Sequence, residues 1–206
     1  MLLDIELKGR PRALVIVAHP DDEIIWMGGT IMRFKNVDWT VFSLCRADDS
    51  DRAPKFKRVM EYFKIQGFIE DLEDEDIMGL KESVPVIQKR ISAFLKNRNF
   101  DLLFTHGLNG EYGHKRHIGT HLAIENLLKT GEISFQDVYF FNYQKQDNGK
   151  ELIVSKKDTE YILKLNEREY KEKRRIVAEM YGYPYDGIDV NLCAPEEAFI
   201  KYNHNL

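Results

Sequence analysis

An uninterrupted apolar run, Ala13-Leu-Val-Ile-Val-Ala18, lies near the start of the chain. Its β-branched residues do not alternate with polar ones, which predicts a strand buried on both faces, as in a parallel sheet covered by helices on either side. Parallel strands are joined by long crossover connections that are usually helical. This run therefore favours a chain built from strand–helix–strand units.

The rest of the chain alternates between strand-like and helix-like patterns. The predicted strands after the first cover 38–44, 100–105 and 137–142, and the predicted helices cover the segment after the first strand, 52–63, 84–95, 117–128 and 159–181. We expect the tail from Gly182 to be loop with at most a short final helix. The alternation predicts a three-layer α/β sandwich with a mostly parallel sheet. A length of 206 residues fits one domain spanning 1–206.

Composition excludes several classes of function. Hydrophobic residues make up 43% of the chain and charged residues 31%, with a net charge of -4, so there is no basic field for binding nucleic acid. Residues 1–8 lack the basic start and apolar run of a signal peptide. No apolar run approaches the roughly 20 residues of a membrane span. We expect a cytoplasmic protein with a small-molecule substrate, and its oligomeric state is left open.

Cys45 and Cys193 are the two cysteines, and neither belongs to a CxxC pair. We expect both to be reduced thiols. The segment 69–78 is rich in carboxylates. It is interpreted as a solvated surface loop and not as a calcium site, because the glycine and spacing of an EF-hand loop are missing.

The string His19-Pro20-Asp21-Asp22-Glu23 directly follows the first strand. Clustered carboxylates raise one another's pKa, and a divalent cation reverses the sign of that energy. In open parallel sheets, ligands bind outside the carboxyl ends of the strands. The position and composition of the string therefore indicate a metal site.

A second polar cluster, Gly110 to His117, follows the predicted strand 100–105 and carries His114 and His117 three positions apart. If the sheet is parallel, both clusters lie at the same edge. His19, one aspartate and one histidine are then expected to form a His₂Asp metal site with open positions.

Together the two clusters resemble the metal-dependent N-deacetylases called PIG-L or LmbE-like. This family includes N-acetylglucosaminyl-phosphatidylinositol deacetylase and deacetylases of mycothiol, bacillithiol and antibiotic pathways. Its pattern is His-Pro-Asp-Asp-Glu after the first strand of a Rossmann-like domain, then His-x-x-His roughly one hundred residues later. Further similarities are Gly28-Gly29, the Gly-Glu-Tyr-Gly before His114 and, more loosely, 45–52 and 195–199, so the resemblance spans most of the chain.

The resemblance implies an enzyme that hydrolyses the N-acetyl group of an N-acetylglucosamine-type sugar or glycoconjugate. It implies that His19, Asp22 and His117 bind one Zn²⁺ or another divalent ion, and that Asp21 is the general base. His114 would act as oxyanion stabiliser and acid, in a positively charged form. Tyr112 matches a tyrosine that helps to polarise the carbonyl, and packing is the alternative role.

Several assignments have rivals. His117 and His121 are four residues apart and form an alternative ligand pair, whereas His106 is expected to support the site without binding metal. Arg46 and Arg52 are candidate contacts for an anionic substrate group. Where some relatives carry an acidic residue, this chain has Arg116, which leaves the partner of His114 open.

Other functions fit the residues less well. A nucleotide-binding domain would need the Gly-x-Gly-x-x-Gly that is missing after the first strand, and a metallophosphoesterase would need a second metal. A metal-binding protein without activity, or a hydrolase of another small amide, remains an alternative. The acyl acceptor cannot be read from the sequence.

Overall fold

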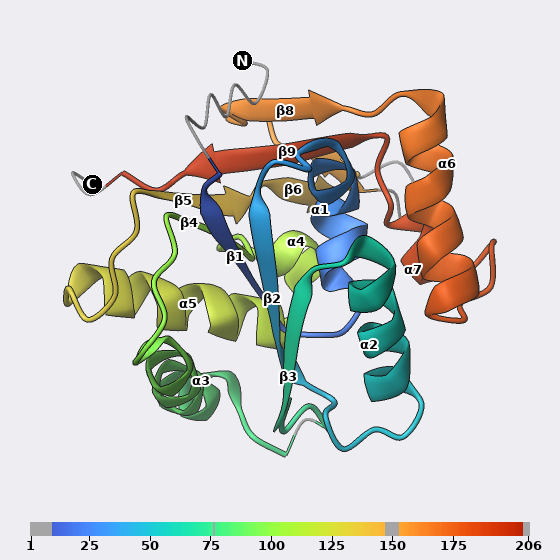
Figure 1. The fold of residues 1–206 in the computed structure, drawn as a ribbon. Coiled ribbons are helices and arrows are strands. Elements are labelled where there is room, and N and C mark those ends of the chain that lie inside the picture. The colour runs from blue at the N-terminus through green and yellow to red at the C-terminus, as the bar shows by residue number, and fades with distance from the viewer. Residues whose placement is uncertain (1–9, 76, 147–152, 204–206) are drawn as a thin grey trace.

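The computed structural model describes residues 10–75, 77–146 and 153–203. A seven-stranded sheet has the order β3-β2-β1-β4-β5-β9-β8 (Figure 1). The strands are β1 (Arg12–Val17), β2 (Asp38–Cys45), β3 (Gln66–Leu72), β4 (Leu102–Thr105), β5 (Asp137–Phe141), β8 (Tyr161–Lys164) and β9 (Glu196–Lys201). β1 to β5 are parallel, and β9 runs antiparallel to both of its neighbours. The predicted α/β class is confirmed.

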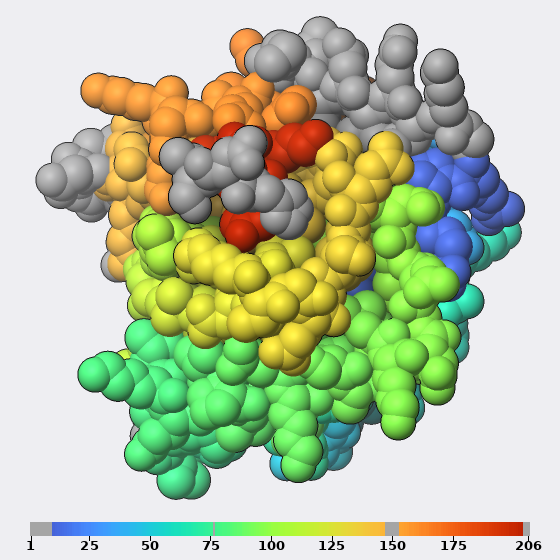
Figure 2. All heavy atoms as spheres, turned by 90° about the vertical axis from the view of Figure 1, so that its left-hand side faces the viewer, coloured from blue at the N-terminus to red at the C-terminus, as the bar shows by residue number. Residues whose placement is uncertain are grey.

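Helices cover both faces of this sheet, as Figure 1 shows. One face carries α1 (Asp22–Arg33), α2 (Arg52–Phe63), α6 (Glu167–Arg175), a π-helical turn (Ile176–Met180) and α7 (Ile188–Asn191). The other carries α3 (Leu80–Leu95) and α5 (Lys115–Lys129), and Figure 2 views the molecule from that side. β6 (Tyr143–Lys145) and β7 (Ile153–Ser155) pair antiparallel as a separate two-stranded sheet, and α4 (Gly110–Gly113) precedes α5.

The first strand is the centre of the core. Every residue from Ala13 to Ala18 is fully buried. Val15 and Val17 pack into the cluster under α1 and α2, whereas Leu14 and Ile16 pack into the cluster under α3 and α5. Because successive side chains of a strand point to opposite faces, a strand with helices on both sides needs apolar residues at every position.

Three predicted segments differ from the structure. The acidic segment begins as the edge strand β3, the predicted helix 159–181 begins only at α6, and the tail, predicted to be loop with at most a short final helix, also contains the strand β9. Helix α6 starts where Asn166 accepts a hydrogen bond from the Glu169 backbone N–H at 3.0 Å, a capping box. The residues before it form β8, which buries Leu163 against β9.

Helix α1 is interrupted at Met27, whose φ is -147° and ψ 20°. Beyond the break, the backbone N–H groups of Gly29 and Thr30 donate to the Glu197 carboxylate at 2.7 and 2.6 Å. Glu197 also pairs with the fully buried Lys173 ammonium at 2.8 Å. A β-carbon on Gly29 would lie 2.2 Å from a methyl group of Leu165, so close packing excludes a side chain at this position.

Among the described residues, no helix combines the length and apolar character that crossing a bilayer requires.

Candidate metal centre

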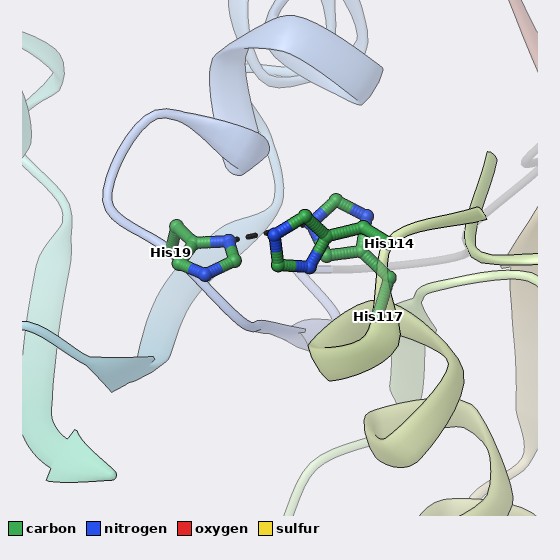
Figure 3. A group of neighbouring side chains, drawn as sticks. All are labelled: His19, His114 and His117. Carbon is green, nitrogen blue, oxygen red and sulfur yellow. Dashed lines mark hydrogen bonds between the residues drawn. The ribbon is translucent and has the colours of Figure 1, made fainter. Parts of the chain in front are cut away.

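The two polar clusters meet at the carboxyl ends of β1 and β4, which are neighbouring parallel strands. The chain leaves β1 toward β2 on one side and leaves β4 toward β5 on the other. Ligand sites in open α/β sheets lie at such a reversal of strand order. Figure 3 shows the rings of His19, from the loop after β1, and of His114 and His117, from the start of α5, converging on one space.

Three ligand atoms form an equilateral arrangement. His19 Nδ1 lies 3.3 Å from Asp22 Oδ2, His117 Nε2 lies 3.3 Å from the same oxygen, and the two ring nitrogens are 3.3 Å apart. Zinc binds such atoms at about 2.0–2.2 Å in a tetrahedron, which separates its ligands by about 3.3 Å. The donors and their spacing therefore fit one zinc ion, with a fourth position left open.

Neighbouring groups orient two of these ligands. Glu111 Oε2 lies 2.6 Å from His117 Nδ1, so a proton on Nδ1 leaves the Nε2 lone pair facing the other ligand atoms. The Trp26 indole N–H donates to Asp22 Oδ1 at 2.9 Å, which turns Oδ2 toward the histidines. Buried partners of this kind fix the tautomer and orientation of metal ligands.

Glu111 is the functional residue that sequence reasoning missed. Its backbone has a φ of 57° and its side chain is fully buried. Burial alone would raise the pKa of its carboxyl, but the charges and hydrogen bonds of His106 and His117 lower that pKa to about 2. The Gly-Glu-Tyr-Gly string is visible in the sequence. Only the fold shows that the carboxylate of this string points into the protein.

His106 supports the site, as expected. Its Nε2 accepts a hydrogen bond from the Ala18 backbone N–H at 2.9 Å, and its Nδ1 lies 2.9 Å from Glu111 Oε2. A ligand atom of His106 also lies within 4.8 Å of those of Asp22 and His117. Because the N–H of Ala18 occupies the Nε2 lone pair, His106 is not available as a ligand in this arrangement.

His121 is directed away from the cluster. Its Nδ1 lies 3.0 Å from the His106 backbone carbonyl oxygen, and its ring packs on Phe140. It is not part of any group of three or more potential ligands within the described residues. The structure therefore does not support the rival pair of His117 and His121.

Asp21 lies beside the three ligands in a strained backbone conformation, with a φ of 121°. Its Oδ2 accepts hydrogen bonds from Arg52 Nη1 at 2.9 Å and from the Tyr183 hydroxyl. Burial and the neighbouring charge of Asp22 raise the pKa of Asp21 to about 7, against the opposing effects of Arg52 and Tyr183. A carboxylate with a pKa near neutrality is suited to proton transfer.

His114 caps the N-terminus of α5, and its Nδ1 accepts a hydrogen bond from the Arg116 backbone N–H at 3.3 Å. Its ring centroid lies 4.7 Å from that of His19 and 4.6 Å from that of His117. Burial and then the charges of His117 and His19 lower the pKa of His114 to about 4. This differs from the expected positively charged donor: at neutral pH the ring is neutral and carries its proton on Nε2.

The candidate substrate contacts Arg46 and Arg52 are both paired with carboxylates. Arg46 donates to Asp74 at 2.9 Å and to Glu75 at 2.6 Å, and Arg52 binds Asp21. Tyr112 lies at the site with its ring centroid 5.5 Å from that of His117. Burial, followed by the charges of Asp22 and Asp21, raises the pKa of the Tyr112 hydroxyl, so Tyr112 stays a neutral donor.

The acidic segment is not a solvated loop throughout. Arg116, only 2% exposed, donates from Nε and Nη2 to the Glu73 carbonyl and carboxylate, both at 2.6 Å. Asp74 Oδ2 lies 3.0 Å from His19 Nε2. Burial alone would raise the pKa of the Asp74 carboxyl. The hydrogen bond from His19 and the charges of His19 and Arg46 outweigh burial and lower that pKa to about 2. Sequence reasoning missed this contact, because alternating carboxylates also fit a solvated surface.

Cys45 has a ligand atom within 4.8 Å of those of His19 and Asp74. Burial and the neighbouring charge of Asp74 raise the pKa of its thiol. Cys193 is likewise buried, and both cysteines are free thiols, as expected.

A sequence model of the family PIG-L, described as GlcNAc-PI de-N-acetylase, matches residues 14–128. An uncharacterized protein of Acanthamoeba polyphaga mimivirus is 25% identical over 186 residues, which are 82% of this chain and 75% of that protein.

Solved structures share the fold at low identity. The N,N'-diacetylchitobiose deacetylase of Pyrococcus horikoshii superposes with a TM-score of 0.67 at 16% identity, covering 93% of this chain and 84% of that one. A deacetylase of teicoplanin biosynthesis gives 0.65 at 13% identity, over 93% and 99% of the two chains. GalB, a 4-carboxy-2-hydroxymuconate hydratase from Pseudomonas putida, gives 0.63 at 15% identity, over 95% and 98%.

The family match spans more than half of the chain and includes both polar clusters and the strands that bring them together. The chain belongs to the PIG-L family.

Proposed function

We propose that the protein is a zinc-dependent hydrolase that removes the acetyl group from an N-acetylglucosamine-type sugar or glycoconjugate. The observation that carries this proposal is the 3.3 Å triangle of His19, Asp22 and His117 atoms, with Asp21 and His114 beside it. When bound, the zinc ion supplies Lewis acidity, which polarises a carbonyl oxygen and makes water acidic enough to lose a proton near neutral pH.

The chain's own residues supply the remaining steps. Asp21 accepts the proton of the attacking water, and Arg52 and Tyr183 hold its carboxylate in place through Oδ2. His114 donates from Nε2 to the oxygen of the acyl group as negative charge develops there, which is the role of an oxyanion donor. Tyr112 is a second neutral donor at the same opening. The proton on Asp21 is then returned to the leaving amine.

The substrate class rests on the family and on the deacetylases among the structural neighbours. Fold likeness alone does not decide the reaction, because the hydratase from Pseudomonas putida shares the fold. Asp21 favours catalysis over a purely metal-binding role. None of the three ligand positions requires its carboxylate, yet it is held in a strained conformation beside them.

The experiment is a screen for acetate release by zinc-loaded protein. N-acetylglucosamine, N,N'-diacetylchitobiose, a nucleotide-linked and a lipid-linked N-acetylglucosamine and a simple N-acetylated amine are the substrates. Asp21→Asn is the matched control, and we expect it to be inactive on every compound that wild type deacetylates. Acetate release from the simple amine alone would support another small amide as substrate, and release from none would contradict the proposal.

A further inference from the structure

We propose that Arg116 and Asp74 are positioning residues that together fix the orientation of the His19 ring toward the metal ion. The proposal rests on the proposed function only in so far as His19 is taken as a metal ligand. Neither residue touches the substrate in this account. Both act through the segment between β3 and α3.

The buried side chain of Arg116 binds this segment. It lies in the first turn of α5, directly before the ligand His117, and is 2% exposed. Its guanidinium donates to the Glu73 carbonyl and carboxylate, both at 2.6 Å, and to the Met78 carbonyl at 3.0 Å. Charge-assisted hydrogen bonds of a buried, planar guanidinium fix geometry as well as adding stability. Glu73 and Met78 are therefore both tied to α5.

Asp74 directly follows Glu73, which Arg116 binds. Its Oδ2 lies 3.0 Å from His19 Nε2 and 2.9 Å from Arg46 Nη2. As an acceptor, Asp74 holds the imidazole proton on Nε2, so the lone pair of Nδ1 is directed toward Asp22 Oδ2 and His117 Nε2. Asp74 thus does for His19 what Glu111 does for His117. A carboxylate partner of this kind also raises the basicity of a ligand histidine.

The arrangement couples the two histidine ligands. His117 and Arg116 are neighbours in α5, and Arg116 places the carboxylate that orients His19 after β1. One helical turn therefore carries one ligand directly and positions the other through Asp74. A shift in α5 relative to the β3–α3 segment would move both histidines.

The first measurement uses metal-free protein, in which ¹⁵N shifts report the tautomer of each histidine ring. At a pH high enough for the His19 ring to be neutral, we expect its single proton on Nε2 in wild type. In Asp74→Ala we expect a mixture of tautomers, and Asp74→Asn, which keeps a carbonyl acceptor, should restore part of the preference. Asp71→Asn is the control, because Asp71 lies in the same acidic stretch but pairs with Arg90 and should leave His19 unchanged.

The second measurement is zinc affinity by competition with a chelator. Loss of an orienting partner typically weakens metal binding about 10- to 100-fold, and we expect a loss of that size for Asp74→Ala. Arg116→Met should weaken zinc binding in the same direction, and the double variant should be no weaker than Asp74→Ala alone, because both act through one carboxylate. Because Arg116 is buried, Glu73→Gln is the milder variant if Arg116→Met does not fold.

An unchanged His19 tautomer together with zinc affinity within about twofold of wild type in Asp74→Ala would overturn the proposal. Fully additive losses in the double variant would overturn the part that assigns Arg116. Failure of the proposed function is distinguishable: a protein that binds zinc tightly but releases no acetate contradicts the hydrolase and leaves the positioning role standing.

Discussion

Asp21 has a strained backbone conformation and a side-chain carboxyl with a raised pKa. Its φ of 121° costs energy of order 1–3 kcal/mol for a residue with a side chain. Burial and Asp22 raise its pKa to about 7. Both features follow from placing a carboxylate at the turn between a buried strand and a helix, directly beside a metal ligand. The structure therefore maintains an unfavourable backbone conformation at the residue that we propose as the base.

Asp21→Asn tests the base. The amide is nearly isosteric with the carboxylate but cannot accept the proton of water, so we expect turnover to fall on the order of 10²- to 10⁴-fold. Metal content and thermal unfolding should stay close to wild type, because Asp21 is not one of the three ligand residues. A variant with nearly wild-type turnover would move the base elsewhere. Glu23, whose carboxyl is buried against the Tyr181 hydroxyl at 2.5 Å, would be the next residue to examine.

His114→Ala tests the oxyanion donor. We expect kcat to fall about 10²- to 10³-fold with zinc affinity nearly unchanged. Because the pKa of His114 is lowered to about 4, the ring is neutral throughout a profile from about pH 6 to about pH 9. The shape of the kcat profile should therefore match that of wild type while its amplitude falls. Loss of the metal ion in this variant would show that His114, and not the assigned set, binds it.

The roles of single residues were predictable from the sequence only in part. The two strings and the parallel sheet predicted a site with His19, one aspartate and one histidine, and the resemblance to the PIG-L family implied Asp22 and His117. Glu111 and Asp74 were not predicted, because their function depends on backbone turns that direct the carboxylates inward. Arg52 is a predicted substrate contact, and the structure pairs it with Asp21 across more than thirty residues, a pairing that no local pattern encodes.

Among the elements, helix α1 is bound through its backbone to Glu197, which also forms a buried ion pair with Lys173. The break at Met27 exposes two backbone N–H groups, and Glu197 from β9 accepts both while pairing with Lys173. Replacing one partner of a buried pair leaves an uncompensated charge, which typically costs about 3–5 kcal/mol. The ion pair therefore joins α1, β9 and α6 into one unit.

Lys173→Met should lower the free energy of unfolding by about 3–5 kcal/mol, because Glu197 is left buried without its cation. Urea unfolding monitored by circular dichroism is the measurement. Lys171→Met is the matched control: it removes an exposed pair with Glu167 on the same helix, and such pairs contribute about 0.3–0.5 kcal/mol. Equal effects of the two substitutions would contradict a structural role for the buried pair.

The elements themselves were predicted best where burial is two-sided. β1, β2, β4 and β5 lie within the central sheet, and their apolar runs identified them. β3 and β8 are edge strands with mixed composition, and β9 pairs with two strands that are distant in sequence, so their patterns resemble loop or helix. Tertiary pairing rather than local propensity determines these three strands.

At the scale of the whole molecule, a metal ion bound at the proposed centre would link segments from both polar clusters and stabilise the folded state. A ligand that binds only the folded protein adds about 2.7 kcal/mol at a free concentration 100 times its Kd. We expect zinc to raise the Tm of wild type and chelator to lower it. Zinc should shift the Tm of His117→Ala far less, and an equal shift in that variant would place the ion outside the proposed centre.

The site depends on the sheet as a whole, because β1 and β4 must be adjacent and parallel for the clusters to meet. The measurement that tests this account most directly is the metal content of purified protein by elemental analysis. We expect about one divalent ion per chain in wild type and in His121→Ala, and loss of that ion in each of His19→Ala, Asp22→Ala and His117→Ala. Full retention of the ion in all three ligand variants would contradict the metal centre.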